Sequence, residues 1–334
     1  MKSLSIIIPC RNEERYIGRC LDSVLRTTYP HDRLEVIVID GQSEDATRAI
    51  VESYAARHPF IRLIDNPKKI APAALNLGVS ASKGEYIIRL DAHTEYPHDY
   101  FERLVDASIR LGAANVGAVC RTETMSKTPT ANAIQNVLSD RFGVGNSSFR
   151  TGVSEIVEAD TVPFGCFRRD TFERYGLFDE RLIRNQDIEF NKRIARGGGK
   201  IYLIPDVTCT YFARETYAGL WRNNYQNGYW NILTPYYTRT LRSLSLRHFV
   251  PLLFVLGLIV PTLLSLLWAP FLWVGAAVLG LYLVAVGIRS AQIGKNTTWL
   301  RQIAAFAVLH FSYGFGSIGG IITILKKIPR QGQR

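Results

Sequence analysis

The strongest constraint on the fold of this chain is a run of forty residues, 249–288, that contains no Asp, Glu, Lys, Arg or His. Because about 20 apolar residues cross a bilayer, this run predicts two membrane helices, 249–268 and 271–288, that turn at Trp268-Ala269-Pro270. The alternative is the buried core of a soluble domain. Buried soluble helices seldom run this long without a charge, so we expect a membrane region.

A third apolar segment, 303–325, leaves two interpretations open. Its stretch Tyr313-Gly-Phe-Gly-Ser-Ile-Gly-Gly320 permits a break, as in a re-entrant or interfacial segment, whereas Gly316 and Gly320 form a small-xxx-small packing face. Three crossings would place the basic tail, 326–334, opposite the N-terminal domain, against the positive-inside tendency. We nevertheless expect a third full span.

The rest of the chain has the composition of a globular domain, which we expect over residues 1–235, with an interfacial linker at 236–248. Met1-Lys2-Ser3 leads directly into the apolar run Leu4–Pro9, which is too short to be the apolar region of a signal peptide. We therefore expect the domain on the cytoplasmic face of the inner membrane, in a multi-pass protein. Five scattered cysteines without Cys-x-x-Cys spacing fit a reducing compartment and argue against structural zinc; they are Cys10, Cys20, Cys120, Cys166 and Cys209.

The formal net charge is +11, which indicates that the protein binds a negatively charged partner. Nucleic acid is not expected, because the soluble part has no Lys/Arg-rich tract with interleaved aromatic residues. The basic residues gather beside the apolar segments instead, at Arg239, Arg242, Arg247, Lys326, Lys327, Arg330 and Arg334. Anionic lipid headgroups and anionic substrates are the expected partners.

Strand-like and helix-like patterns alternate through the first ninety residues. We expect strands at 4–8, 34–39, 61–64 and 85–90, and helices at 13–25, 45–57 and 72–81. This alternation predicts right-handed βαβ units and an α/β fold with a mainly parallel sheet flanked by helices. In such sheets ligands bind at the carboxyl ends of the strands.

Polar residues follow three of these strands, namely Pro9–Glu13, Asp40 and Asp91-Ala-His93. Side chains alternate along a strand, so Asp91 and His93 point the same way and could hold a divalent cation. Asp40 could bind a nucleotide or simply begin a turn. Asp187 begins a helix, where it could be a cap or a general base. No Gly-x-Gly-x-x-Gly follows the first strand and no Walker-type Gly-Lys-Ser/Thr loop is present, which argues against a classical dinucleotide-binding or P-loop enzyme.

These residues together resemble the inverting family 2 glycosyltransferases, which have the GT-A fold. The resemblance covers residues 4 to about 235 and rests on six motifs in order, Ile8–Glu14, Asp40–Thr47, Leu75–Gly78, Gly84–Ile87, Asp91–His93 and Asn185–Asp187. Within the family, Asp91–Pro97, Phe142–Asn146 and the apolar C-terminal region look most like the succinoglycan-type glucosyltransferases of bacterial exopolysaccharide assembly.

The resemblance implies a role for each matching residue. Asp187 would be the catalytic base, and Asp91 and His93 would hold Mg²⁺ or Mn²⁺ on the donor diphosphate. The remaining nucleotide-sugar contacts would be Pro9, Arg11, Asn12, Glu13, Asp40 and Asn76. Further substrate contacts would come from Gly165, Gln186, Arg214, Trp221, Gln226 and Trp230.

This chain departs from the family pattern at several positions, among them Asp40-Gly-Gln-Ser43 in place of the common Asp-Asp-Gly-Ser turn. His93 replaces the second Asp of the usual Asp-x-Asp, which makes Mn²⁺ at least as plausible as Mg²⁺. Gln186 replaces the usual Glu before the base, so the charge near Asp187 must come from elsewhere, with Arg184 and Arg193 as candidates. Tyr229 stands where processive synthases have an Arg, which favours a single-addition transferase.

Aromatic residues cluster over 211–237. They could stack on sugars, but the apolar run that follows favours an interfacial amphipathic helix.

The sequence therefore predicts a membrane-anchored, metal-dependent hexosyltransferase. It would move glucose or another hexose from a UDP-sugar to a lipid-linked (polyprenyl) saccharide in exopolysaccharide or cell-surface glycan synthesis, together with other polysaccharide-assembly proteins. Two alternatives stay open. One is a polyprenyl-phosphate glycosyltransferase, whose acceptor is the lipid phosphate, and the other is a catalytically silent scaffold of an export complex.

Overall fold

The computed structural model describes residues 1–241 and 246–327, with the side chains of 246 and 247 excepted. Of the expected basic residues, Arg242, Arg330 and Arg334 and the side chain of Arg247 lie outside the described residues, as does the tail beyond 327. The chain divides into two compact units. Unit 1 comprises Met1–Thr122 and Ser148–Phe212, and unit 2 comprises Glu123–Ser147 with the described part of Ala213–Arg334. This division differs from the single boundary expected at residue 235.

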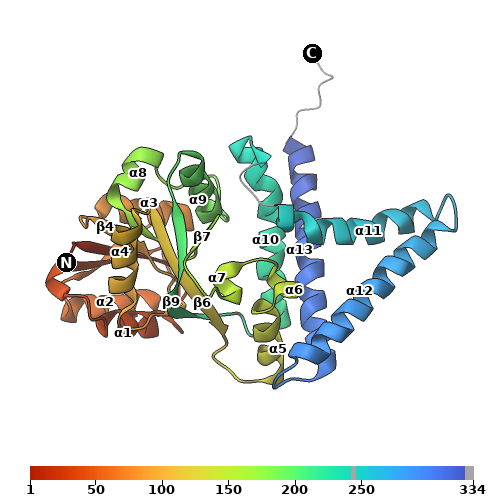
Figure 1. Ribbon diagram of the computed structural model, residues 1–334, viewed down its shortest axis with the longest axis horizontal. Coiled ribbons are helices and arrows are strands. Elements are labelled where there is room, and N and C mark those ends of the chain that lie inside the picture. The colour runs from red at the N-terminus through yellow and green to blue at the C-terminus, as the bar shows by residue number, and fades with distance from the viewer. Residues whose placement is uncertain (242–245, 328–334) are drawn as a thin grey trace, which may run out of the picture. The chain divides into compact units, whose positions relative to one another are not determined.

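Unit 1 is built on one mixed sheet (Figure 1). Its strand order is β3-β2-β1-β4-β8-β6-β9-β5, and β7 also pairs with β9. The strands are β1 (Leu4–Cys10), β2 (Leu34–Asp40), β3 (Ile61–Asp65), β4 (Tyr86–Arg89), β5 (Thr94–Glu95), β6 (Asn115–Glu123), β7 (Val157–Glu158), β8 (Cys166–Arg168) and β9 (Ile201–Phe212). The first four strands are parallel as predicted, while β8 pairs antiparallel with both β4 and β6.

Helices cover both faces of this sheet, because side chains of the buried strands alternate between two cores. Even-numbered residues such as Ile6, Val36 and Ile88 pack with α1, α2 and α4. Odd-numbered residues such as Ile7 and Ile37 pack with α3, α8 and α9. The helices of unit 1 are α1 (Ile17–Leu25), α2 (Thr47–Arg57), α3 (Ala71–Ala81), α4 (Tyr100–Leu111), α7 (Ser148–Thr151), α8 (Arg169–Tyr175) and α9 (Gln186–Arg196), with the 3₁₀ turn η1 (His31–Arg33).

Unit 2 is helical. It contains α5 (Pro129–Leu138), α6 (Arg141–Val144), α10 (Tyr217–Thr238), the 3₁₀ turn η3 (Leu246–Phe249), α11 (Val250–Leu264), α12 (Phe271–Ile293) and α13 (Trp299–Lys327). Among the described residues, α12 and α13 are long and apolar enough to cross a membrane, and α11 is a shorter apolar helix. The first expected helix thus ends at 264 rather than 268, because residues 265–270 form the turn before Phe271.

The glycines of α13 pack directly against α10. A Cβ at Gly316 would lie 2.0 Å from the carbonyl oxygen of Tyr225, and one at Gly228 of α10 would lie 1.9 Å from that of Tyr313. Only glycine therefore lets the two backbones touch. The predicted small-xxx-small face of Gly316 and Gly320 is confirmed, and α13 continues unbroken through residues 313–320.

Candidate active site

The loops that follow β1 and β2 are joined by hydrogen bonds. The backbone N–H of Asn12 donates to the Ser43 hydroxyl (2.9 Å), and the Asn12 side-chain oxygen accepts from the N–H of Glu44 (2.9 Å). The N–H of Glu13 donates to the Thr47 hydroxyl (2.7 Å). Asn12 itself has φ +55°, a conformation that Asn tolerates better than most residues. Parallel strand ends thus bring Pro9–Glu13 beside Asp40–Thr47, as predicted.

Asp40 is fully buried and stabilises the turn in which it lies. Its carboxylate accepts from the Ser43 hydroxyl (2.6 Å) and from the Ser43 N–H (3.2 Å), and Nη1 of Arg48 lies 3.8 Å away. These contacts match the turn-forming alternative. A nucleotide contact from Asp40 stays a prediction, because the carboxylate would have to exchange one of these partners.

Arg89 joins the two carboxylates that the sequence predicted as donor and base sites. It is the last residue of β4, and its side chain is 11% exposed. Nη1 lies 3.2 Å from Oδ2 of Asp187, and Nη2 lies 3.8 Å from Oδ2 of Asp91. Asp91 and Asp187, distant in sequence, therefore share one guanidinium.

The neighbouring carboxylates stabilise the protonated form of the Arg89 guanidinium. Burial opposes the protonated form, but the carboxylates of Asp91 and Asp187 outweigh it and raise the pKa of Arg89. Asp187 lies in the first turn of α9, after Asn185 at φ +63°, and its Oδ1 accepts from the N–H of Ile188 (2.8 Å). An anion is favoured at such a helix start.

Arg89 was missed by the sequence analysis. The candidates named there were Arg184 and Arg193, but Arg193 pairs with Glu189 in its own helix (2.7 Å). One signal was present, because Arg89 is the only charged residue within the apolar strand Tyr86-Ile-Ile-Arg89-Leu90. A charge at the end of a buried strand requires a charged partner.

His93 lies in an acidic and aromatic environment. Its Nδ1 is 3.5 Å from Oε1 of Glu13, and its ring centroid is 5.0 Å from that of Tyr211 and 6.1 Å from that of Tyr16. Burial disfavours the imidazolium, but Tyr211, Asp91 and Glu13 favour it more strongly and raise the pKa of His93 to about 10.

This environment fits a divalent cation. The residues that the structure describes contain no group of three or more His, Cys, Asp or Glu placed to hold an ion by themselves. A site with two protein ligands and open positions suits Mg²⁺ or Mn²⁺, which commonly take their remaining ligands from water and substrate phosphates. The negative surroundings that hold a proton on His93 would favour a metal cation in the same way.

Asn76 and Gly165, two residues of the predicted site, already have close partners within unit 1. The Asn76 amide donates to the carbonyl of Phe178 (2.9 Å) and to Glu180 (3.3 Å), and accepts from the N–H of Phe178 (3.0 Å), so it holds α3 to this loop. A Cβ on Gly165 would lie 2.2 Å from the Asn115 side chain. The carbonyl of Gly165 accepts from the N–H of Arg89 (3.1 Å). Both residues are buried, and a substrate contact from either one stays a prediction.

The other predicted contacts differ in their surroundings. Gln186 is buried at the start of α9, Pro9 is half-buried in β1, and Arg11 is exposed with Nη2 3.6 Å from Oε1 of Glu44. The remaining predicted contacts belong to unit 2, and their roles stay predictions; they are Arg214, Trp221, Gln226 and Trp230. Within that unit, Trp230 is buried and its ring stacks on Tyr237.

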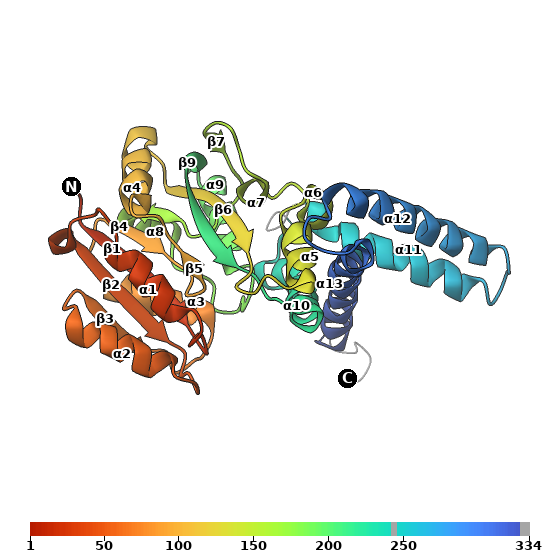
Figure 2. The ribbon, with the colours of Figure 1, turned by 90° about the horizontal axis from the view of Figure 1, so that it is seen from below.

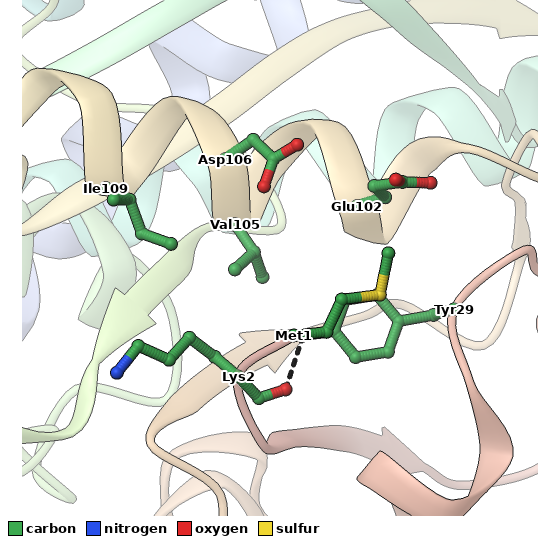
Figure 3. Close-up of a pocket in the computed structure, with 7 residues that line it drawn as sticks. All are labelled: Met1, Lys2, Tyr29, Glu102, Val105, Asp106 and Ile109. Carbon is green, nitrogen blue, oxygen red and sulfur yellow. Dashed lines mark hydrogen bonds between the residues drawn. The ribbon is translucent and has the colours of Figure 1, made fainter.

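A cavity of about 410 Å³ lies elsewhere in unit 1 (Figure 3). Met1, Lys2, Tyr29 and four residues of α4 line it, and the Tyr29 hydroxyl donates to the carbonyl of Lys2 (2.6 Å). Met1 and Lys2 precede β1, so this cavity lies at the amino ends of the parallel strands. Ligands of such sheets bind at the opposite edge, and none of the predicted site residues lines it.

Known proteins match this chain over nearly its full length. The family model described as glycosyl transferase family 2 matches residues 5–176. The succinoglycan biosynthesis protein ExoA of Rhizobium meliloti is 28% identical over 316 residues, which are 93% of this chain and 92% of that protein. A second relative, from Methanococcus voltae, is 28% identical over 65% of this chain and 68% of its own length. It is the dolichyl N-acetyl-alpha-D-glucosaminyl phosphate 3-beta-D-2,3-diacetamido-2,3-dideoxy-beta-D-glucuronosyltransferase.

Solved structures show the same fold. The mannosyltransferase PcManGT of Pyrobaculum calidifontis, in complex with GDP-Man and Mn²⁺, superposes with a TM-score of 0.59 at 20% identity, over 96% of this chain and 87% of that one. Residues 1–349 of TarS from S. aureus give a TM-score of 0.53 at 15% identity, over 94% and 92% of the two chains. The chain belongs to glycosyl transferase family 2, and its catalytic fold is GT-A.

Proposed function

We propose that this protein is an inverting hexosyltransferase that moves a sugar, glucose first among the candidates, from a UDP-sugar to a lipid-linked saccharide. The proposed setting is bacterial exopolysaccharide or cell-surface glycan synthesis, alongside other assembly proteins, at the cytoplasmic face of the inner membrane. The similarity to ExoA along nearly the whole chain supports the setting. The observation that carries the proposal is the buried Arg89 between Asp91 and Asp187.

The proposed donor site lies at the carboxyl ends of β1, β2 and β4. Pro9–Glu13 and the turn at Asp40 would contact the nucleotide, and Asp91 and His93 would hold Mg²⁺ or Mn²⁺. Mn²⁺ accompanies the nucleotide sugar GDP-Man in the structural neighbour from Pyrobaculum calidifontis. When bound, the metal would neutralise negative charge on the departing nucleoside diphosphate.

Asp187 is the proposed general base. The acceptor hydroxyl oxygen forms a bond to the anomeric carbon, its proton passes to the Asp187 carboxylate, and the bond from the anomeric carbon to the diphosphate oxygen breaks with its electron pair. General-base catalysis of this kind contributes about 10²–10⁴-fold. The side chain of Asp187 is about one-third exposed, which leaves room for an acceptor.

Arg89 positions this base. A guanidinium 3.2 Å from Oδ2 fixes the orientation of the carboxylate. Because Asp91 contacts the same guanidinium, Arg89 also couples the position of the base to that of the donor site. Reaction geometry depends steeply on such positioning.

The test is turnover of UDP-hexoses with a polyprenyl-linked saccharide, measured as UDP release. Asp187→Asn is expected to lower kcat by at least about 10²-fold while UDP binding is retained. Asp170→Asn is the matched control, because Asp170 is an exposed residue of α8 paired with Arg168. Absence of turnover across a panel of donors and acceptors would contradict the proposal.

The same variant distinguishes the alternative acceptor. A polyprenyl phosphate is already ionised and needs no strong base. If Asp187→Asn keeps full activity toward polyprenyl phosphate, the protein is a polyprenyl-phosphate glycosyltransferase instead. A scaffold would show no metal-dependent UDP binding.

A further inference from the structure

The helices α11 and α12 form a hairpin that stands away from the α10–α13 pair within unit 2 (Figures 1 and 2). No residue of 249–288 is charged. Large apolar side chains are exposed at its tip, with exposed fractions of 86% for Leu267 and 76% for Trp273. The neighbouring Leu266, Trp268 and Leu272 are also exposed. An exposed apolar surface of this kind is typical of a site that contacts lipid or another protein.

Most backbone N–H groups at the tip donate within the hairpin itself. The N–H groups of Ser265–Trp268 donate to carbonyls three or four residues earlier, and those of Phe271–Trp273 donate to Trp268, Ala269 and Pro270. The hydroxyls of Thr262 and Ser265 also donate to backbone carbonyls, at 2.7 Å each. A turn in water can leave such groups to the solvent, whereas a turn in hydrocarbon must satisfy them internally.

The arms are somewhat shorter than a hydrocarbon layer is thick. At 1.5 Å per residue, the 15 residues of α11 span about 22 Å, and residues 271–288 of α12 span about 27 Å. The hydrocarbon core of a bilayer is about 30 Å thick. The tip therefore need not emerge on the far side, where its leucines and tryptophans would meet water.

The base of the hairpin makes polar contacts as well as apolar ones. Arg289, one residue after the charge-free run, pairs with Asp140, and its Nε lies 3.0 Å from Oδ1 of that residue. In the loop that follows α12, the carbonyl of Lys295 accepts from Asn136 (3.1 Å) and that of Asn296 accepts from Asn132 (2.8 Å). Residues 123–147 continue directly into unit 1 at both ends of the segment, and their helices, α5 and α6, are too short to cross a membrane.

The third apolar helix, α13, is tied to a polar helix along its length. The Tyr217 hydroxyl donates to the carbonyl of Arg301 (2.9 Å), Tyr229 to Thr323 (3.1 Å), and Lys327 to Tyr237 (2.7 Å). The two helices thus run parallel. A crossing by α13 would carry α10 into hydrocarbon with the polar side chains of Arg222, Asn223, Asn224, Gln226, Asn227 and Asn231. Such residues are expensive there.

We propose that only the α11–α12 hairpin enters the bilayer, as a re-entrant loop whose tip stays inside the membrane, and that α13 lies with α10 at headgroup level. This replaces the expected three spans with an anchor inserted from one side. The end of α13 then stays on the side of unit 1, which removes the conflict with the positive-inside tendency. The inference concerns lipid contact alone and does not rest on the proposed reaction.

The first test places the tip by tryptophan quenching. The full chain is bound to vesicles of phosphatidylethanolamine and phosphatidylglycerol with bromine at mid-chain positions of the acyl groups. We expect most of the quenching to disappear in W268F/W273F and to remain in the control W221F/W299F, whose tryptophans lie outside the hairpin. Unchanged quenching in W268F/W273F, or none in the unaltered protein, would overturn the insertion and point to a second protein copy as the cover.

The second test determines sidedness with a membrane-impermeant maleimide. The five native cysteines are buried, so added cysteines report clearly. With protein added to preformed sealed vesicles, Leu325→Cys in α13 and Ser53→Cys on α2 should both react from outside, and Leu267→Cys only after detergent. Protection of Leu325→Cys from outside would restore the third span, and reaction of Leu267→Cys with maleimide trapped in the lumen would show a crossing. Either result overturns the proposal.

Discussion

At the scale of single residues, the proposed site depends on the positive charge of Arg89, which is not itself a proposed substrate contact. Arg89 lies at the end of a buried strand, and the carboxylates of Asp91 and Asp187 are its partners. A guanidinium suits this place because it presents several donors in a fixed plane and stays charged. One side chain thereby connects Asp91, the proposed metal ligand, with Asp187, the proposed base.

Replacing Arg89 tests this role. Arg89→Gln is expected to lower kcat by about 10²-fold, because the orienting charge is lost. It should also lower the free energy of unfolding by about 2 kcal/mol, since a partly buried ion pair loses one member. Arg89→Lys should recover stability better than kcat, because an ammonium lacks the planar fork. Steady-state kinetics and thermal unfolding measure both, with the exposed Arg168→Gln as control; equal recovery of both by Lys would contradict a positioning role.

The replacement His93→Asp tests the choice of metal. A second carboxylate is a harder ligand than imidazole, so the ratio of activity with Mn²⁺ to activity with Mg²⁺ should fall roughly tenfold. Titration of each metal against initial rate measures this ratio. His98→Asn is the control, because His98 is an exposed residue outside the predicted site. An unchanged ratio would show that His93 is not a ligand.

The sequence predicted the acidic part of the site better than the rest. Asp91 and Asp187 were recognised because they follow or begin regular elements at the edge where ligands bind. Arg89 was overlooked because its strand reads as apolar, and its partner Asp187 lies far away in sequence. Asn76 was assigned to the nucleotide because a pattern cannot reveal that the amide is already used by Phe178 and Glu180.

At the scale of elements, glycine determines how α10 and α13 approach. Gly228 lies where any Cβ would collide with the backbone of Tyr313, whereas Gly280 of α12 has open space around its Cβ position. Close approach allows short contacts such as the Ser317 hydroxyl donating to the carbonyl of Gly228 (3.2 Å). The pair therefore acts as one rigid element.

The two glycines form a matched test of this packing. Gly228→Ala should destabilise unit 2 by about 3 kcal/mol, because the added methyl group forces the helices apart. Gly280→Ala adds the same group to an open helix position and should be neutral or slightly stabilising. Thermal unfolding in detergent, followed by helical circular dichroism, compares them. Equal stability of the two variants would show that α10 and α13 do not pack closely.

Elements with a strong pattern were predicted to within a few residues. The strands over 34–39 and 61–64 appear as Leu34–Asp40 and Ile61–Asp65, and the helix over 72–81 as Ala71–Ala81. The helix expected from residue 13 begins only at Ile17, because Glu13 and Glu14 are occupied in the loop beside Asp45 and Thr47. The antiparallel strand β8 has only three residues, too few for a periodic pattern, and its pairing with β4 is set by tertiary contacts.

At the scale of the whole chain, the boundary between units 1 and 2 is not a single point in the sequence. Residues 123–147, within the stretch expected to be catalytic, pack with the C-terminal helices through Ala133, Ile134 and Val137. Hydropathy alone could not reveal this, because the segment is short and mostly polar. The consequence is three chain connections between the units rather than one.

The basic end of α13 provides a prediction about lipid composition. If α13 lies at headgroup level, Lys326 and Lys327 contact anionic lipid, and each contributes about 1 kcal/mol to binding. The double change Lys326→Gln and Lys327→Gln should therefore weaken binding of the full chain to phosphatidylglycerol-containing vesicles by roughly tenfold or more, and leave binding to neutral phosphatidylcholine vesicles unchanged, because the apolar hairpin still inserts. Lys83→Gln, an exposed lysine of unit 1, is the control. Vesicle sedimentation at low and high salt measures the difference, which salt should abolish by screening. Equal loss on both vesicle types would instead indicate that the two lysines support the fold, through the contact of Lys327 with Tyr237.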